Sequence, residues 1–228
     1  MDSIFQVLRD NLQILTFRRS SQRIVVNWQR YLAVGFFITW VVGMGRYWDN
    51  PKASLWQYAG LGSVLYVVCL AFLLWIILLP LGPKHWSYRN VLIFLTMTSL
   101  PALLYAIPVE LFMSLSAAQT TNVLFLAVVA TWRVALLGWF LRVIAGLSGP
   151  KILVGTLLPI AIIIVALSAL NLEHVVFNIM AGLAPEERSA NDAAYYVVIY
   201  LSFFSILALP ILILLYGILI YRQRRADK

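Results

Sequence analysis

The feature that most constrains this chain is a succession of apolar blocks, each about as long as a membrane span, separated by short polar turns. Of its 228 residues, 62% are hydrophobic and only 11% are charged. Soluble domains are about half apolar and about a quarter charged, so this composition lies outside that class. Because a chain in lipid must satisfy its backbone polar groups internally, the blocks predict an all-α, polytopic transmembrane helical bundle.

The blocks divide the chain into three parts: a membrane-surface segment (1–30), a single membrane domain (31–221) and a basic cytoplasmic tail (222–228). Six spans are predicted, at about 31–45, 56–81, 91–115, 123–148, 152–170 and 195–221. Pro101 and Pro108 interrupt the third span, where each frees a backbone carbonyl and kinks the helix. The small residues Ala59-Gly60-Leu61-Gly62-Ser63 open the second span and favour close helix packing.

The N-terminal segment has the pattern of a basic amphipathic helix. Its apolar residues recur at helical spacing, at Ile4, Leu8, Leu12 and Leu15. Four arginines follow, namely Arg18, Arg19, Arg23 and Arg30. We expect this segment to lie on the membrane surface, with its arginines on anionic lipid headgroups.

The distribution of basic residues predicts the orientation. With both termini cytoplasmic, thirteen of the 17 Lys and Arg residues fall on the cytoplasmic side, three fall on the other side, and Arg133 lies within a span. This is the bias of the positive-inside rule, and it accounts for the net charge of +8 without a nucleic-acid partner. We therefore expect an N-in/C-in protein of a bacterial inner (plasma) membrane.

Arg133 is the main candidate binding residue, because it lies near the middle of the fourth predicted span. An arginine at that depth costs at least about 2.5 kcal/mol unless something receives its charge. The internal candidates are the carboxylate of Glu110 and a carbonyl freed near Pro101 or Pro108. The alternative is that Arg133 binds a transported anion.

No catalytic, metal or cofactor site is predicted. The sequences Gly146-Leu147-Ser148-Gly149 and His174-Val-Val-Phe-Asn178 resemble the GxSG and HxxxN elements of rhomboid proteases. Their order is reversed here, however, and Ser148 and His174 are predicted on opposite sides of the membrane, beyond hydrogen-bond reach. The two histidines, His85 and His174, lie in separate loops, and a solvated acidic loop accounts for Glu186, Glu187 and Asp192.

Residues 82–168 resemble the Yip family of small membrane proteins, which are Rab-GTPase-interacting proteins in eukaryotes and have bacterial relatives. The resemblance rests on a basic loop leading into a span (LGPKHWSYRNVLIFL), a proline-bearing segment (SLPALLYAIP), a Trp-containing span (TWRVALL) and the loop GLSGPK. It implies a non-enzymatic scaffold that organises other membrane proteins or lipids, often as an oligomer.

The sequence therefore predicts a non-catalytic membrane scaffold or accessory subunit, with a membrane-protein partner or as a homo-oligomer. The first alternative is a small-solute (anion) transporter or channel that uses Arg133 at mid-membrane. A membrane-embedded lipid-modifying enzyme or protease is a remote alternative.

Overall fold

The computed structural model describes residues 4–18, 26–48, 54–170 and 193–226, and every regular element within these ranges is a helix. Four helical segments are long and apolar enough to cross a membrane: Leu61–Leu81, Thr120–Val143, Gly149–Ala169 and Ile199–Arg225. A fifth span results if the bent pair Tyr88–Met97 and Leu100–Ala106 is counted as one. The helical membrane character expected from the sequence is thus present.

The structure forms two compact units, and each is considered by itself. The first comprises residues 1–107 and 131–147, and the second comprises residues 108–130 and 148–228. The long helix α7 (Leu115–Val143) contributes its first half to the second unit and its last turns to the first.

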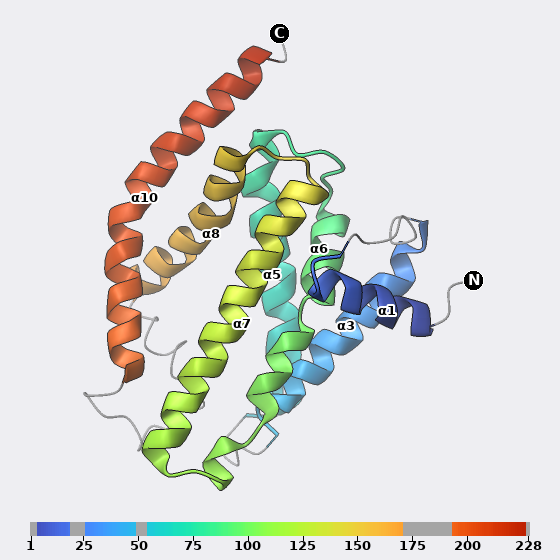
Figure 1. The fold of residues 1–228 in the computed structure, drawn as a ribbon, viewed down its shortest axis with the longest axis vertical. Coiled ribbons are helices and arrows are strands. Elements are labelled where there is room, and N and C mark those ends of the chain that lie inside the picture. The colour runs from blue at the N-terminus through green and yellow to red at the C-terminus, as the bar shows by residue number, and fades with distance from the viewer. Residues whose placement is uncertain (1–3, 19–25, 49–53, 171–192, 227–228) are drawn as a thin grey trace. The chain divides into compact units, whose positions relative to one another are not determined.

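Helix α6 (Tyr88–Met97) is the central element of the first unit, since residues 91–99 are all buried. Helices α3 (Trp28–Gly45) and α5 (Leu61–Leu78) pack against it (Figure 1). The Phe94 ring of α6 stacks on Phe140 of α7, with 4.2 Å between the ring centroids. A helix buried on all sides matches the largely apolar sequence of this segment.

The third predicted span, 91–115, is broken into several elements. Helix α6 ends at Met97, and the 3₁₀ helices η2 (Leu100–Ala106) and η3 (Val109–Leu111) follow. The axis bends by 42° between α6 and η2, and helix α7 begins at Leu115, earlier than the predicted 123. Pro101 explains the break, because proline lacks the N–H that an α-helix needs at that position.

Helix α3 runs parallel to the bent pair formed by α6 and η2. At one end, the Arg89 guanidinium lies 5.0 Å from the Trp28 ring centroid. At the other end, the Trp48 indole N–H donates to the Ala106 carbonyl at 2.9 Å. Helix α3 itself is not among the span candidates, which we attribute to the polar Gln29 and Arg30 in its first turn.

Small residues bring α3 close to its neighbours. A Cβ atom added at Gly35 would lie 2.4 Å from the Thr96 hydroxyl oxygen of α6. One added at Gly43 would lie 2.8 Å from both the Gly60 carbonyl oxygen and the Ser63 side chain, at the start of α5. The close packing predicted for the small-residue segment 59–63 is therefore confirmed at Gly60 and Ser63.

The remaining elements are short connectors and two long apolar helices. The short helix α4 (Leu55–Tyr58) precedes α5, and η1 (Leu79–Leu81) follows it. In the second unit, α8 (Gly149–Ala169) and α10 (Ala193–Ala226) pack antiparallel (Figure 1). Lys151 hydrogen-bonds Gln223 near one end of this pair, and Ser168 bonds Ser202 at 2.8 Å near the other.

The N-terminal segment forms helix α1 (Ile4–Leu15), and the side that it buries carries both apolar and polar residues. Val7 and Ile14 pack with Tyr31, Ile93 and Met97 in one buried cluster. Asp10 and Asn11 are buried beside them, whereas Ile4, Leu8 and Leu12 are exposed. Of the predicted apolar stripe, only Leu15 is buried. The predicted positions Arg18 and Arg30 are exposed, and Arg19 and Arg23 lie outside the described residues.

Candidate arginine and tyrosine site in the first unit

The two prolines leave two backbone carbonyls without their usual helical N–H donor, and each carbonyl accepts a hydrogen bond from another donor. The carbonyl four residues before Pro101 is that of Met97, and the Asn11 side-chain amide donates to it at 2.6 Å. The carbonyl four residues before Pro108 is that of Leu104, which accepts from the Ile107 N–H at 3.3 Å. Both carbonyls accept from other donors, and the predicted contact of such a carbonyl with Arg133 stays a prediction.

Hydroxyl groups supply further hydrogen bonds around the break. Thr39 of α3 and Ser99 share a hydrogen bond of 2.9 Å between their hydroxyl oxygens. The Thr96 and Thr98 hydroxyls bond carbonyls of α6 itself, one turn back. All four side chains are buried, so these bonds hold the broken segment against α3 without exposing polar groups to lipid.

A buried carboxyl group lies beside this break. The Tyr31 hydroxyl donates to the Asp10 carboxylate at 2.5 Å, and Asp10 is 5% exposed. Burial of a carboxylate is costly unless it is hydrogen-bonded, and Tyr31 provides such a bond. Among the described residues of the first unit, Asp10 is the sole acidic side chain.

The candidate site is a cluster of three side chains, Arg46, Tyr105 and Arg133, which we call the arginine–tyrosine cluster. Arg46 follows the last residue of α3, Tyr105 lies in η2 and Arg133 lies in α7. The Arg46 guanidinium carbon lies 5.4 Å from the Tyr105 ring centroid and 5.7 Å from that of Tyr47. The charges of Arg46 and Arg133 both act electrostatically on Tyr105.

Arg133 lies near the middle of a candidate span. It lies 13 residues after Thr120 and ten before Val143, the two ends of the candidate span. Its Nη2 atom is buried and has no hydrogen-bond partner in the described part of the chain. Because a buried polar nitrogen without a hydrogen bond is costly, this atom of the half-buried Arg133 indicates an acceptor that the described residues do not supply.

The electrostatics of the cluster favour an anion. The Arg46 guanidinium lies over the Tyr105 ring and the charge of Arg133 also acts on Tyr105, while the described acid of this unit, Asp10, is bonded to Tyr31. Guanidinium groups bind carboxylate, phosphate and similar oxyanions through paired N–H donors. The cluster is thus chemically suited to hold a small anion or a carboxylate from elsewhere in the chain.

Sequence reasoning identified part of this cluster. It singled out Arg133 but selected neither Arg46 nor Tyr105. The sequence around Arg46 does not indicate which aromatic ring its side chain contacts, so the contact with Tyr105 could be identified only from the structure. The side chain of Glu110 lies outside the described residues, and its predicted pairing with Arg133 stays a prediction.

The structure does not describe how the two rhomboid-like elements lie relative to each other. Ser148 is the N-cap of α8 and is exposed, while His174 and Asn178 lie outside the described residues, as do Glu186, Glu187 and Asp192. Gly146 adopts a left-handed conformation (φ 64°) in a turn packed against Lys84. Within the described ranges, no group of three or more His, Cys, Asp or Glu side chains could hold a metal ion.

These features define a helical, membrane-type fold with a charged cluster inside it. Searches of known protein families, of curated protein sequences and of solved structures gave no match to this chain.

Proposed function

We propose that the chain is a six-span integral membrane protein of a bacterial inner membrane, with both termini in the cytoplasm. Four or five spans are supported by length and composition. Helix α3 supports the sixth, because its two ends lie beside the two ends of the bent pair and so cover the same depth. The Lys84 N–H donates to the Ala145 carbonyl at 2.8 Å, so two basic turns predicted on the cytoplasmic side lie together.

The function that the geometry supports best is that of an anion-binding membrane protein of the transporter or channel class. The observation that carries this proposal is the buried Arg133 Nη2 atom, which has no hydrogen-bond partner among the described residues. A second guanidinium, that of Arg46, lies over the ring of Tyr105, on which the charge of Arg133 also acts. The broken third span lies next to the cluster, and interrupted helices commonly form substrate sites near the middle of transporter folds. The anion would bind Arg133 and Arg46, with the Tyr105 hydroxyl as a further donor.

Anion flux into liposomes tests this proposal. Purified protein is reconstituted in vesicles of defined lipid, and chloride, nitrate and phosphate entry is followed with an anion-sensitive dye. We expect Arg133→Ala to reduce flux at least tenfold, because the charge at mid-depth is lost. Arg142→Ala is the matched control, since Arg142 lies in the last turn of the same helix and is exposed.

Binding is measured separately, so that a slow transporter is not mistaken for an inert protein. Ligand that binds only the folded state stabilises it by about 2.7 kcal/mol at a hundred times its dissociation constant. We expect these anions to raise the melting temperature of the parent protein and not that of Arg133→Ala. If no anion alters the stability of the parent and no flux is seen, the anion proposal is rejected.

A second candidate function is the membrane scaffold or accessory subunit, of the kind that the Yip-like motifs imply. The observation that favours it is the exposure of α10, where 11% of the candidate span is buried compared with 33% in α8. A membrane-protein partner or a second copy could cover this helix. Native mass spectrometry after mild extraction tests this idea, and a monomer carrying no protein companion would count against it.

A further inference from the structure

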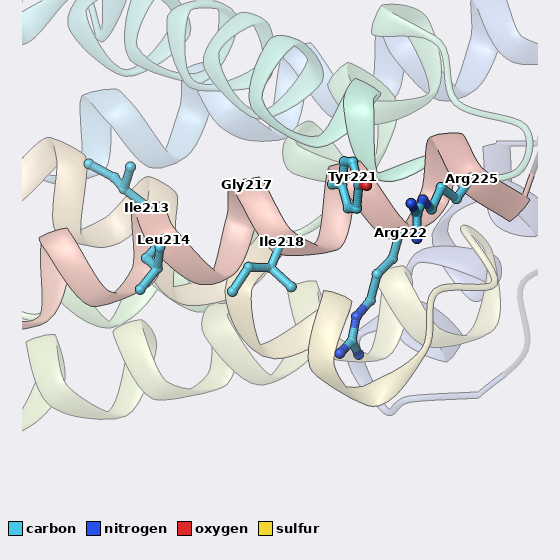
Figure 2. A pocket seen from close by; sticks show the side chains of 7 residues that line it. All are labelled: Ile213, Leu214, Gly217, Ile218, Tyr221, Arg222 and Arg225. Atoms are coloured by element: carbon cyan, nitrogen blue, oxygen red, sulfur yellow. The ribbon is translucent and has the colours of Figure 1, made fainter.

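A shallow groove runs along α10, and it is independent of the arginine–tyrosine cluster. Figure 2 shows the seven side chains that line it, all from this one helix: Ile213, Leu214, Gly217, Ile218, Tyr221, Arg222 and Arg225. The first four give an apolar floor. The last three place a phenol and two guanidinium groups at the C-terminal end.

The groove lies on the side of α10 that faces away from α8. Ser202, Leu212 and Gln223 mark the α8 side, through the bonds to Ser168 and Lys151 and through burial of Leu212. At about 100° per residue, Leu214, Tyr221 and Arg225 fall roughly opposite that side, and Gly217 falls at its flank. A Cβ atom added at Gly217 would meet nothing within 4 Å, so the groove is open there.

The dimensions of the groove match one membrane leaflet. Ile213 and Arg225 are 12 residues apart, which is about 18 Å along a helix. Half of a hydrocarbon core about 30 Å thick is about 15 Å. An acyl chain lying on Ile213 and Ile218 would therefore bring its headgroup to the level of the two arginines.

The charges at the end of the groove select the headgroup. Arg225 lies over the Tyr221 ring, with 4.9 Å between its guanidinium carbon and the ring centroid, and Arg222 is exposed beside it. None of the residues lining the groove is acidic. Guanidinium groups bind phosphate oxygens in a paired geometry, and tyrosine is suited to the membrane–water interface.

From these features we propose that the α10 groove binds one anionic phospholipid, with an acyl chain along Ile213, Gly217 and Ile218 and its phosphate on Arg222 and Arg225. The apolar floor requires an amphipathic occupant, and the two cations require a negative headgroup. A free phosphate ion would use only the basic end of the groove.

Photocrosslinking tests this site. Full-length protein is placed in phosphatidylcholine nanodiscs containing a phosphatidylglycerol with a photoreactive diazirine in its acyl chain, and labelled peptides are mapped. We expect labelling within residues 213–221, reduced at least fivefold by the double variant Arg222→Gln/Arg225→Gln. Gly217→Leu, which fills the open position, is expected to reduce labelling similarly while both arginines remain.

The control is Arg224→Gln, which removes one charge from an exposed neighbour that does not line the groove. The proposal predicts that this variant is labelled like the parent and that 10 mM inorganic phosphate does not displace the lipid. Loss of labelling in Arg224→Gln equal to that in the double variant would indicate general charge attraction and overturn the site. Displacement by inorganic phosphate, or labelling unaffected by the double variant, would also overturn it.

Discussion

Single polar side chains determine how this apolar chain folds. The Asn11 amide donates to the Met97 carbonyl that Pro101 leaves without its helical donor, and the Tyr31 hydroxyl donates to the Asp10 carboxylate. Arg133 has a buried nitrogen without a hydrogen-bond partner in the described ranges. The Asn11 amide and the Asp10 carboxylate both have hydrogen-bond partners within the first unit. Arg133 is the exception, and it is therefore the residue from which we infer a ligand.

Asn11 gives a stability prediction. We expect Asn11→Ala to lower the free energy of unfolding by about 1–3 kcal/mol, because the buried Met97 carbonyl loses its donor. Gln13→Ala on the same helix is the control, since the Gln13 side chain is half-buried and not part of this contact. Thermal unfolding in a mild detergent is the measurement, and equal stability of the two variants would contradict the prediction.

Glu110 gives a prediction that separates an internal ion pair from an external anion. If the Arg133 charge is received by an anion from solution, we expect Glu110→Gln to leave anion-dependent stabilisation intact. If Glu110 is the natural partner, the variant should be less stable without anion and should bind anion more tightly, because a competing carboxylate is gone. Melting curves at several chloride and phosphate concentrations distinguish the two outcomes.

At the scale of elements, hydrophobic block length predicted most helices and missed the detail of the third span. Residues 56–81, 152–170 and 195–221 are largely helical as expected, because such blocks have no other way to satisfy their backbone in lipid. The two prolines were seen as a kink, yet the segment breaks into two 3₁₀ helices. That outcome depends on donors such as Asn11, 86 residues away, which no local pattern contains.

The same limit applies to the candidate site and to α1. Arg133 could be identified because a lone charge in an apolar block is conspicuous, whereas Arg46 and Tyr105 meet only through tertiary packing. In α1 the helical period was correct, but the buried side carries Asp10 and Asn11. Apolar periodicity cannot distinguish a face that contacts lipid from one that contacts protein.

Packing between α3 and α6 gives a prediction at this scale. We expect Gly35→Ala to destabilise the protein by about 1–3 kcal/mol, because the new methyl group would overlap the buried Thr96 side chain. Gly217→Ala should be neutral or slightly stabilising, since its position is open and alanine favours helix. Parallel thermal unfolding of both variants checks this, and equal destabilisation would show that the close approach is unimportant.

At the scale of the whole molecule, the distribution of charge predicts a topology. We expect a reporter fused after Lys228 to be cytoplasmic, and a cysteine introduced at His85, in a Cys69→Ser background, to react only with reagents that cross the membrane. A cysteine at Trp48 should react with impermeant reagents added from outside, because α3 would carry it across. An extracytoplasmic reporter at Lys228 would overturn the N-in/C-in arrangement.

The bond between Asn11 and Met97 also has a consequence for biogenesis. Asn11 leaves the ribosome 86 residues before the carbonyl that it must bind. Helix α1 can therefore make this contact only after the segment that contains Met97 has been synthesised. Only then does the Met97 carbonyl, left without its helical donor by Pro101, receive a hydrogen bond. Helix α1 thus precedes α6 in the chain but cannot complete its packing before α6 has formed.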